Sequence, residues 1–406
     1  MIQITEKSAC CGCSACVSVC PKQCISFNED VQGFLYPSVN TETCINCGLC
    51  EKVCPIIRQG KIKQPLKVYA AKSKNETVRL QSSSGGVFSI LAENVINCGG
   101  VVFGAKFDKN WEVYHDFVET IDGLSSLRGS KYVQSRIGDS YLKAEMFLKQ
   151  GREVLFCGTP CQIAGLKNYL RKEYSNLLAV DFVCHGVPSP LIWREYLKTL
   201  ICQKGVVGRN TDLLFSKEIP VIIGVDFRNK ATGWKKYGFT VRAKSSHKVD
   251  RNTDLQFDKS EDVVNQPFFK NVFMQGFLQN LYLRPSCYAC PSKNGKSGAD
   301  ITLGDFWGIE NHYPEFDDDK GCGLILLNTL KLNDLLAEKC DLQETTFEKV
   351  AAGNPCILHS VDTPANYRYF WKVYAKSKDL ENTLTTIHDL RFLMRLRRLI
   401  YRKIGI

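Results

Sequence analysis

Short apolar runs alternate with segments of helical periodicity through the middle of the chain. The runs at 68–71, 99–105, 153–156 and 177–183 are largely apolar and rich in β-branched or aromatic residues, which is typical of buried strands. Between them, apolar residues recur at helical spacing up to about Ile96, over 141–149 and over 162–170. Strands that alternate with helices in this way predict an α/β body.

Other segments have different patterns. The first four residues predict a strand, and the polar, basic stretch 58–67 predicts a linker. Residues 205–265 predict an inserted or edge β region, with strands near 221–228 and 237–243 and no evident chemistry. The aromatic-rich stretch 265–284 predicts a helix.

Composition limits the class of protein. The chain has 406 residues, enough for two or three domains, and its 44% hydrophobic and 23% charged residues are ordinary for a soluble globular protein. The net charge of this chain is +11, and a high positive charge is common in nucleic-acid-binding proteins. However, part of the excess lies at the C-terminus and no nucleic-acid motif accompanies it, so we expect no nucleic-acid partner.

The cysteine content changes this ordinary picture. There are 20 cysteines, half of them before residue 55, and no signal peptide or membrane-spanning segment is visible in the sequence. Cysteine-rich chains without an export signal typically use their thiols for metal in a reducing compartment. We therefore expect a cytoplasmic protein that binds metal rather than one held together by disulfides.

Two copies of one cysteine spacing, C-x2-C-x2-C-x3-C-P, occupy the first 55 residues. The first copy is Cys10, Cys13, Cys16, Cys20 and Pro21, and the second is Cys44, Cys47, Cys50, Cys54 and Pro55. This spacing holds [4Fe–4S] clusters in bacterial two-cluster ferredoxins, where the fourth cysteine of each copy binds the other cluster. Zinc sites lack the third closely spaced cysteine, and disulfides need an oxidising compartment.

The spacing therefore predicts an α+β ferredoxin-like module with two clusters. We assign the first cluster to Cys10, Cys13, Cys16 and Cys54, and the second to Cys44, Cys47, Cys50 and Cys20. Gly12 and Gly48 allow the close backbone approach that amide-to-sulfide hydrogen bonds require. Cys11 and Cys24 fall outside the pattern and are interpreted as spare thiols near the clusters.

Two loops in the body have the composition of ligand sites. Ser82-Ser83-Ser84-Gly85-Gly86 opens a predicted helix, where hydroxyls, backbone amides and the helix dipole favour an anion such as a flavin phosphate. An ordinary capped turn would explain the same residues. The second loop, from Gly129 to Gln134, mixes a cation, a phenol and an amide, and fits either a ligand-facing loop or a solvated turn.

Four further cysteines follow predicted strands or form a pair. Cys161 begins a helix after the strand 153–156, where the dipole favours thiolate, and Cys184 follows the strand 177–183. Both fall at the carboxyl ends of strands, where α/β proteins place their sites. With Cys287 and Cys290 they are candidates for a third four-thiolate site, although a redox disulfide between Cys157 and Cys161 is an alternative.

With these residues in order, the chain resembles the family of coenzyme F(420) hydrogenase/dehydrogenase beta subunits, in the subgroup with an N-terminal two-cluster ferredoxin domain. The resemblance covers about residues 1–330. It rests on six motifs in family order, namely Ser82-Ser83-Ser84-Gly85-Gly86, Gly129-Ser130-Lys131-Tyr132, Gly158-Thr159-Pro160-Cys161-Gln162, Cys184-His185-Gly186, Cys287-x2-Cys290 and Ala299-Asp300-Ile301 to Gly304-Asp305.

The resemblance implies a bound FAD and a third [4Fe–4S] cluster on Cys161, Cys184, Cys287 and Cys290. It implies flavin contacts from the two loops and, through their motifs, from Thr159 and Asp305; the full set is Ser82, Ser83, Ser84, Gly85, Gly86, Gly129, Ser130, Lys131, Tyr132, Gln134, Thr159 and Asp305. Lys131 would stabilise an anionic reduced flavin or hold a phosphate. His185 would donate a proton to substrate or, as we favour, hydrogen-bond a cluster sulfide. Asp305 would bind the ribityl chain or merely close a strand.

The predicted function is that of an iron–sulfur flavoprotein oxidoreductase. Electrons would pass between a two-electron hydride carrier of the coenzyme F(420) type and ferredoxin-like one-electron partners. A ferredoxin-dependent reductase of a small organic substrate, used in polysaccharide or cofactor biosynthesis, is one alternative. A non-catalytic electron-relay subunit is another. No G-x-G-x-x-G opens a helix after a strand, so the chain has no nicotinamide fingerprint.

The expected division of the chain follows from these motifs. The predicted parts are a ferredoxin domain (1–58), a linker (59–67), an N-terminal flavin-binding domain (68–150), a C-terminal catalytic domain with the third cluster (151–335) and a helical tail (336–406). From Arg391 to Ile406 the tail holds six cations and no acid, with apolar residues at helical spacing. Such a helix lies on a membrane surface in some proteins and docks on the body in others.

Overall fold

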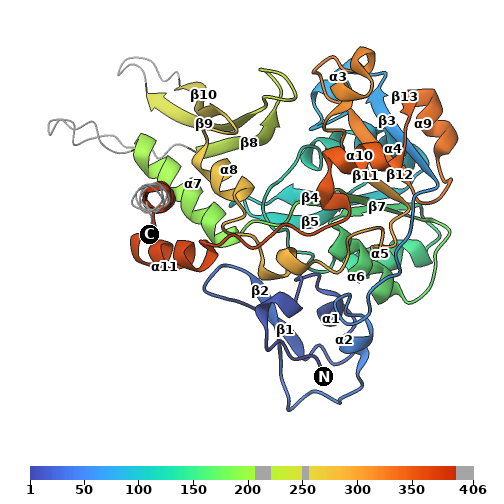
Figure 1. The fold of residues 1–406 in the computed structure, drawn as a ribbon. Helices are drawn as coiled ribbons and strands as arrows, with labels where there is room; N and C mark the ends of the chain where they lie inside the picture. Colours follow the sequence, from blue (N-terminus) through green and yellow to red (C-terminus); the bar gives the residue numbers. More distant parts are fainter. Residues whose placement is uncertain (206–220, 249–255, 390–406) are drawn as a thin grey trace, which may run out of the picture.

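The computed structural model describes residues 1–205, 221–248 and 256–389, and its fold is the predicted α/β body joined to a small α+β ferredoxin-like module. In Figure 1 the module, drawn in blue, lies at one end of the larger body. The strongly basic stretch from Arg391 lies outside the described residues.

The two cysteine repeats fold into the same loop. In each, the residues just before and just after the middle cysteine are left-handed, with φ of 71° at Gly12 and 65° at Ser14 in the first copy, and 51° at Asn46 and 72° at Gly48 in the second. Glycine and asparagine adopt this conformation at low cost. The module is completed by helices α1 (Ala15–Ser18) and α2 (Leu49–Lys52) and by the hairpin of β1 (Ile25–Glu29) and β2 (Leu35–Val39).

The predicted strand at the N-terminus was wrong. The Ile2 amide donates to Cys50 Sγ at 3.3 Å, and the Met1 amino group pairs with the Glu51 carboxylate at 3.1 Å. The segment therefore runs along the second cysteine loop, and the Ile2 amide donates its hydrogen bond to a sulfur and not to a neighbouring strand.

The body is built on an eight-stranded mixed sheet. In spatial order the strands are β13 (Cys340–Glu344), β3 (Lys67–Ser73), β12 (Gly323–Leu327), β11 (Ile301–Asp305), β7 (Leu177–Phe182), β6 (Val154–Gly158), β4 (Val101–Phe107) and β5 (Val113–Val118). The four strands β11, β7, β6 and β4 are parallel, and the others pair antiparallel at the two sides. The carboxyl ends of the four parallel strands therefore open at one edge.

Helices cover both faces of this sheet. Alternate strand residues point to opposite faces, so Leu155 and Leu178 pack under α4 (Val87–Asn97) and α9 (Asn333–Lys339), whereas Phe156 and Leu177 pack under α5 (Ser140–Lys149) and α6 (Pro160–Leu170). The other helices are α3 (Glu76–Leu80), α7 (Pro190–Gly205), α8 (Val272–Leu278), α10 (Phe347–Gly353) and α11 (Tyr367–Ser377), and the 3-10 turns are Lys7–Ala9, Asp122–Ser126, Pro285–Ala289, Ile309–Asn311, Pro314–Phe316 and Pro355–Ile357.

A second, three-stranded antiparallel sheet is inserted beside the body. Its order is β10 (Gln256–Pro267), β9 (Gly238–Lys248) and β8 (Val221–Asn229). The ring of Trp193 lies 5.1 Å from that of Phe227 and 5.2 Å from that of Phe273, which forms an aromatic core under this sheet.

The sequence predicted two of these strands but also a helix over 265–284, and that prediction was wrong in part. Strand β10 continues to Pro267, and the helix is confined to α8, where the side chain of Asn271 caps the first turn. The residues of this stretch that belong to β10, Asn265, Gln266 and Pro267, include no aromatic side chain, so the aromatic composition describes only the part that follows the strand.

The ferredoxin module shares a core with the body. Cys11 and Cys13 pack with the side chains of α5 and α6. Gly165 of α6 permits this approach, because a Cβ there would lie 3.0 Å from both Cβ and Sγ of Cys13. On the other side of the module, a Cβ on Gly33 would lie 2.5 Å from the Leu191 backbone nitrogen. The position of the module against the body is therefore set by close backbone contacts.

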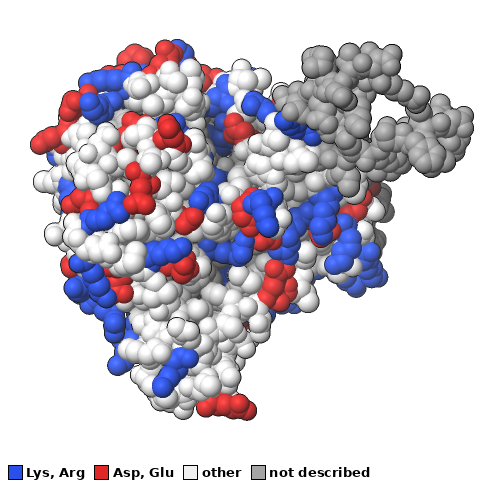
Figure 2. Space-filling view, turned by 180° about the vertical axis from the view of Figure 1, so that it is seen from behind, with Lys and Arg blue, Asp and Glu red and all other residues white. Residues whose placement is uncertain are grey.

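The surface shows no strongly polarised face in the view of Figure 2. Lysine, arginine, aspartate and glutamate side chains are interspersed over the body, and few charged residues lie at the lower end, where the ferredoxin module is. In the part of the chain that the structure describes, no helix combines the length and the apolar character needed to cross a membrane.

Candidate functional site

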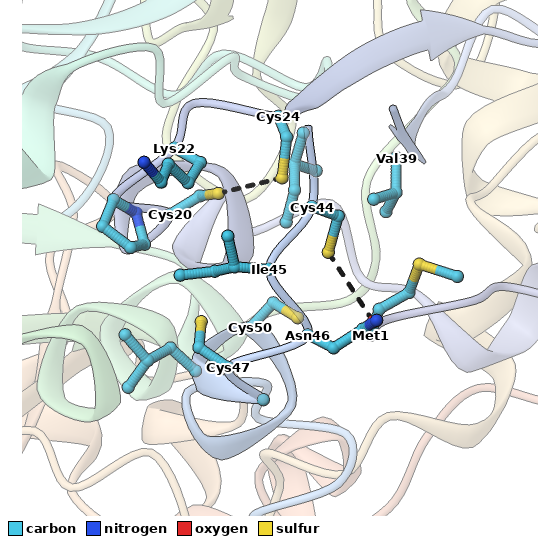
Figure 3. A pocket seen from close by; sticks show the side chains of 14 residues that line it. Met1, Cys20, Lys22, Cys24, Val39, Cys44, Ile45, Asn46, Cys47 and Cys50 are labelled. Atoms are coloured by element: carbon cyan, nitrogen blue, oxygen red, sulfur yellow. Dashed lines mark hydrogen bonds between the residues drawn. The ribbon is translucent and has the colours of Figure 1, made fainter. Parts of the chain in front are cut away.

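Four thiols assigned to the second cluster line one pocket. Cys44, Cys47 and Cys50 come from the second repeat, and Cys20 reaches the same pocket from the first repeat (Figure 3). Cys24 lies beside them, with its Sγ 3.3 Å from Cys20 Sγ. The crossing of Cys20 between repeats is the arrangement that the ferredoxin spacing predicts.

The thiols assigned to the first cluster lie deeper. Burial, together with the neighbouring thiols of Cys10 and Cys54, raises the pKa of Cys16 to about 12. Cys13 also lies close enough to Cys16 for the two thiols to interact. Thiols that are buried together resist ionisation unless a cation compensates them, so the iron of a cluster fits this donor set.

The third candidate set is brought together from three distant segments. Cys161 opens α6, Cys184 follows β7, and Cys287 and Cys290 lie in and just after the turn Pro285–Ala289. Burial raises the pKa of Cys287 to about 12 and that of Cys290 to about 11, and Cys161 contributes to both shifts. The pKa of Cys184 is raised by burial and then by the other three thiols.

Local hydrogen bonds fit this set to an iron–sulfur cluster. The Val187 amide donates to Cys287 Sγ at 3.4 Å, and the Thr159 hydroxyl lies 3.2 Å from Cys161 Sγ. Among the described residues, no group of three or more His, Cys, Asp or Glu is spaced to hold a single metal ion. A cubane spreads its four ligand sulfurs further apart than one ion does.

The alternative disulfide between Cys157 and Cys161 finds no support in the geometry. All 20 cysteines are free thiols. The sulfur neighbour of Cys161 is Cys11, whose hydrogen bond raises the pKa of Cys161 above its ordinary value, followed by burial. Burial raises the pKa of Cys157 to about 12, and the charged neighbours of this thiol are Asp181 and Lys131.

The first and third thiol sets are adjacent. Cys11, Cys13 and Cys161 pack in one cluster with the side chains of α5 and α6. The pKa of Cys11 is raised well above its ordinary value, and the nearby thiol of Cys13 is the largest cause. The spare thiol of the first repeat therefore joins a ferredoxin ligand to a ligand of the third set.

A cavity of about 790 Å³ opens at the carboxyl ends of β6, β7 and β11. This volume is in the range of cofactor sites. Its wall includes every residue predicted as a flavin contact except Gln134, and it also includes His185. The Gln134 amide instead donates to the Cys11 carbonyl at 3.1 Å, so this side chain faces the ferredoxin module.

The serine–glycine loop and the Gly129 loop are tied together in the cavity wall. Ser83 Oγ accepts a hydrogen bond of 2.8 Å from the Ser130 amide. Gly85 is required by space, since a Cβ there would lie 2.2 Å from the Ala71 carbonyl oxygen. Helix α4 begins after Gly86 without a side-chain cap, so its first amides remain available to an anion in the cavity.

Titratable groups in the cavity wall have shifted pKa values. Burial lowers the pKa of Lys131 to about 8, and its ammonium donates to the carbonyls of its own loop, at 2.9 Å to that of Arg128. Burial raises the pKa of Asp181 to about 6, and its Oδ1 has no hydrogen-bond partner. His185 is engaged at both ring nitrogens, by Asn280 Oδ1 at 2.6 Å and Cys356 Sγ at 3.8 Å, and burial lowers its pKa.

The inserted sheet, in which the sequence shows no evident chemistry, contributes a side chain to the cavity wall. Arg228 of β8 lines the cavity, is 4% exposed, and pairs with Asp305 at 2.6 Å. Trp234 Nε1 donates to the same carboxylate at 2.9 Å, so Asp305 fixes Arg228 instead of offering a free carboxylate. Arg228 Nε has no partner, and the guanidinium lies 4.2 Å from the ring centre of Tyr237. A single arginine at the end of a strand carries no spacing that could have identified it.

Comparison with known protein families gives two matches. The family model described as the C terminus of the coenzyme F(420) hydrogenase/dehydrogenase beta subunit matches residues 151–352. A 4Fe–4S dicluster domain model matches residues 9–56. A 7Fe ferredoxin of Hydrogenibacillus schlegelii is 38% identical over 65 residues, which are 15% of this chain and 77% of that protein.

Two further relatives match over longer alignments, each about half of this chain. The coenzyme F(420)-dependent sulfite reductase of Methanocaldococcus jannaschii is 28% identical over 53% of this chain and 34% of its own length. One of the subunits of the F(420)H(2) dehydrogenase of Methanosarcina mazei is 27% identical over 48% of this chain and 60% of its own length. The chain thus spans only part of these relatives.

Among solved structures, a chain of the F(420)-reducing [NiFe] hydrogenase complex of Methanosarcina barkeri is similar, with a TM-score of 0.43 and 15% identity. That similarity covers 81% of this chain and 93% of the other.

The buried pair of Arg228 and Asp305 predicts a large stability effect. Asp305→Asn leaves the guanidinium buried without a counter-charge, so we expect it to lower the free energy of unfolding by about 3–5 kcal/mol. Asp262→Asn removes the partner of Arg242 in an exposed pair and should cost about 1 kcal/mol or less. Denaturant unfolding of both variants measures the difference, and equal losses would contradict the assigned role of Asp305.

Proposed function

The chain belongs to the family of coenzyme F(420) hydrogenase/dehydrogenase beta subunits and carries a 4Fe–4S dicluster domain at its N-terminus, and from this premise we propose that it is an FAD-dependent iron–sulfur oxidoreductase. Its electrons would pass between a hydride carrier of the coenzyme F(420) type and a one-electron protein partner. The observation that carries the proposal is the packing of Cys11 and Cys13 of the ferredoxin domain with Cys161 of the body, whose neighbours Thr159 and Gln162 line the cavity.

A third [4Fe–4S] cluster on Cys161, Cys184, Cys287 and Cys290 is the proposed link between cavity and ferredoxin domain. The buried thiols, the amide of Val187 on Cys287 and the hydroxyl of Thr159 beside Cys161 are the hydrogen-bonded surroundings that such clusters have. Lys293 adds a buried cation, since its ammonium donates to the carbonyls of Cys184 and Cys356. Its charge would balance part of the negative charge of four thiolates.

The cavity is proposed to hold FAD. The uncapped start of α4 and the ammonium of Lys131 would bind its anionic groups, and the unpartnered Nε of Arg228 would donate to an acceptor on the ring or on the substrate. Bound FAD would supply the chemistry that accepts two electrons as a hydride and releases them one at a time. The protein supplies position, exclusion of water and the adjacent cluster.

The second cluster is the proposed exit toward a ferredoxin-like partner. Cys47 is the exposed ligand among the eight ferredoxin cysteines, and its cluster pocket includes the half-exposed Ile45. This end of the molecule carries few charged side chains in Figure 2. We place the protein in the cytoplasm, where its thiols stay reduced.

One feature favours the second candidate function, a ferredoxin-dependent reductase of a small organic substrate. Beyond the flavin loops, the cavity is lined by Tyr237, Phe268 and Trp307, which form an aromatic wall from the inserted sheet and its neighbours. Such a wall would also stack against a planar organic substrate that is not a hydride carrier.

Anaerobic purification followed by reduction with defined donors tests the proposal. We expect FAD to co-purify and its absorption to bleach with reduced coenzyme F(420), because the cavity adjoins the third cluster. Bleaching by reduced ferredoxin alone would favour the reductase. Purified protein that holds its clusters but never binds FAD would leave only the relay role.

The third cluster has its own test. Cys287→Ser should lower the iron and sulfide content by one cubane cluster of three and slow electron transfer from FAD to the ferredoxin domain. Cys157→Ser, which changes a thiol of the cavity wall outside the proposed ligand set, should leave the iron content unchanged. Iron and sulfide analysis with electron paramagnetic resonance (EPR) measures both, and unchanged iron in Cys287→Ser contradicts the proposed ligand set.

Lys131 predicts a pH-dependent affinity for FAD. Its pKa of about 8 means that the ammonium is charged below that pH and neutral above it, so affinity for an anionic ligand should fall several-fold as the pH rises through this value. Lys131→Met should bind more weakly and without this pH dependence, whereas Lys143→Met, on the outer side of α5, should behave as wild type. Fluorescence titration with FAD measures the affinity; the same slope in wild type and Lys131→Met would refute the role.

A further inference from the structure

Arg284 is a buried cation at the junction between the ferredoxin domain and the body. It is 1% exposed and precedes the turn that carries Cys287. Its Nε donates to the Cys10 carbonyl at 2.7 Å, and its Nη2 lies 3.5 Å from Cys10 Sγ and 2.9 Å from the Leu35 carbonyl oxygen. Its Nη1 donates to Gln134 Oε1 at 2.9 Å, and the rings of Tyr36 and Phe34 lie against the guanidinium, at 4.4 Å and 5.4 Å.

This guanidinium has no carboxylate partner within the described ranges. The other deeply buried guanidinium groups differ, since Arg228 pairs with Asp305 and Arg79 pairs with Asp318. A buried charge without compensation costs several kcal/mol, so the site requires negative charge from another source. The thiols that Arg284 contacts or influences are Cys10, Cys161 and Cys287.

These three thiols belong to two different ligand sets. Cys10 is assigned to the first ferredoxin cluster, and Cys161 and Cys287 to the proposed third cluster. A cluster held by four thiolates is anionic, and reduction adds a further negative charge. A nearby cation and a hydrogen bond to a ligand sulfur both stabilise the reduced form and so raise the reduction potential.

We propose that Arg284 is a positioning residue that compensates the charge of the first ferredoxin cluster and of the third cluster and raises the reduction potential of both. The effect on the first cluster follows from the contact with Cys10, and the effect on the third rests on the proposed function. Arg284 thereby favours the presence of the electron at the junction between body and ferredoxin domain.

Redox titration of the anaerobically purified full chain, followed by EPR, tests this role. Arg284→Gln should reduce the ratio of reduced to oxidised first cluster about tenfold at a given potential, which is a shift of about −59 mV for a one-electron couple. Arg284→Lys keeps the charge and loses the fork of donors, so its shift should be smaller. Arg152 contacts Gly99 and Glu119 instead of cluster thiols, so the control variant Arg152→Gln should leave the potentials unchanged.

The same measurement in a Cys287→Ser background separates this inference from the proposed third cluster. The shift of the first cluster should persist there, because Cys10 remains in contact with residue 284. Unchanged potentials in Arg284→Gln with full iron content would overturn the proposal. Loss of the clusters from both Arg284→Gln and Arg284→Lys would also overturn it, since the residue would then serve only to hold the two domains together.

Discussion

The arrangement of this protein depends on the contact between the first cysteine loop and the start of helix α6. Gly165 leaves room for Cys13, and Cys11 reaches Cys161 across the junction. In the proposed relay, electron transfer between clusters would weaken steeply with distance, so a ferredoxin domain on a loose tether would not serve the cavity. Here the thiols of the module pack in the same core as the body, which keeps the distance short.

Local pattern predicted much of the fold and of the first two clusters. The repeat spacing fixes which thiols share a loop, and Gly12 and Gly48, both identified from the sequence, have left-handed backbone conformations. The alternation of strand and helix predicted the body and the edge where Cys161 and Cys184 lie. Each of these features is encoded within a few residues of itself, which is why sequence pattern could find it.

The remaining parts of the site could not be predicted because they depend on contacts between distant segments. Arg228 meets Asp305 across 77 positions, and Arg284 meets Cys10 across 274. No period or spacing connects such residues. Gln134 shows the same limit, since its loop was recognised but its side chain turns to the ferredoxin module and away from the cavity. The third strand of the inserted sheet, β10, was missed because residues 256–267 are mostly polar and show little apolar alternation.

The buried cationic side chains fall into two groups that differ in how their charge is compensated. Arg228 and Arg79 have carboxylates of the same chain, so their charge is balanced in the polypeptide itself. Arg284 and Lys293 are bonded to carbonyl oxygens and lie beside cysteine thiols. Among the described residues, Arg284 forms no ion pair with a carboxylate, whereas Lys293 lies near enough to the buried Asp181 to interact with its carboxyl group. Negative charge on the neighbouring thiols would compensate Arg284 and add to the compensation of Lys293. The buried guanidinium of Arg284 beside Cys10 therefore fits the anionic first cluster of the dicluster domain, and the proposed third cluster would add negative charge at the same junction.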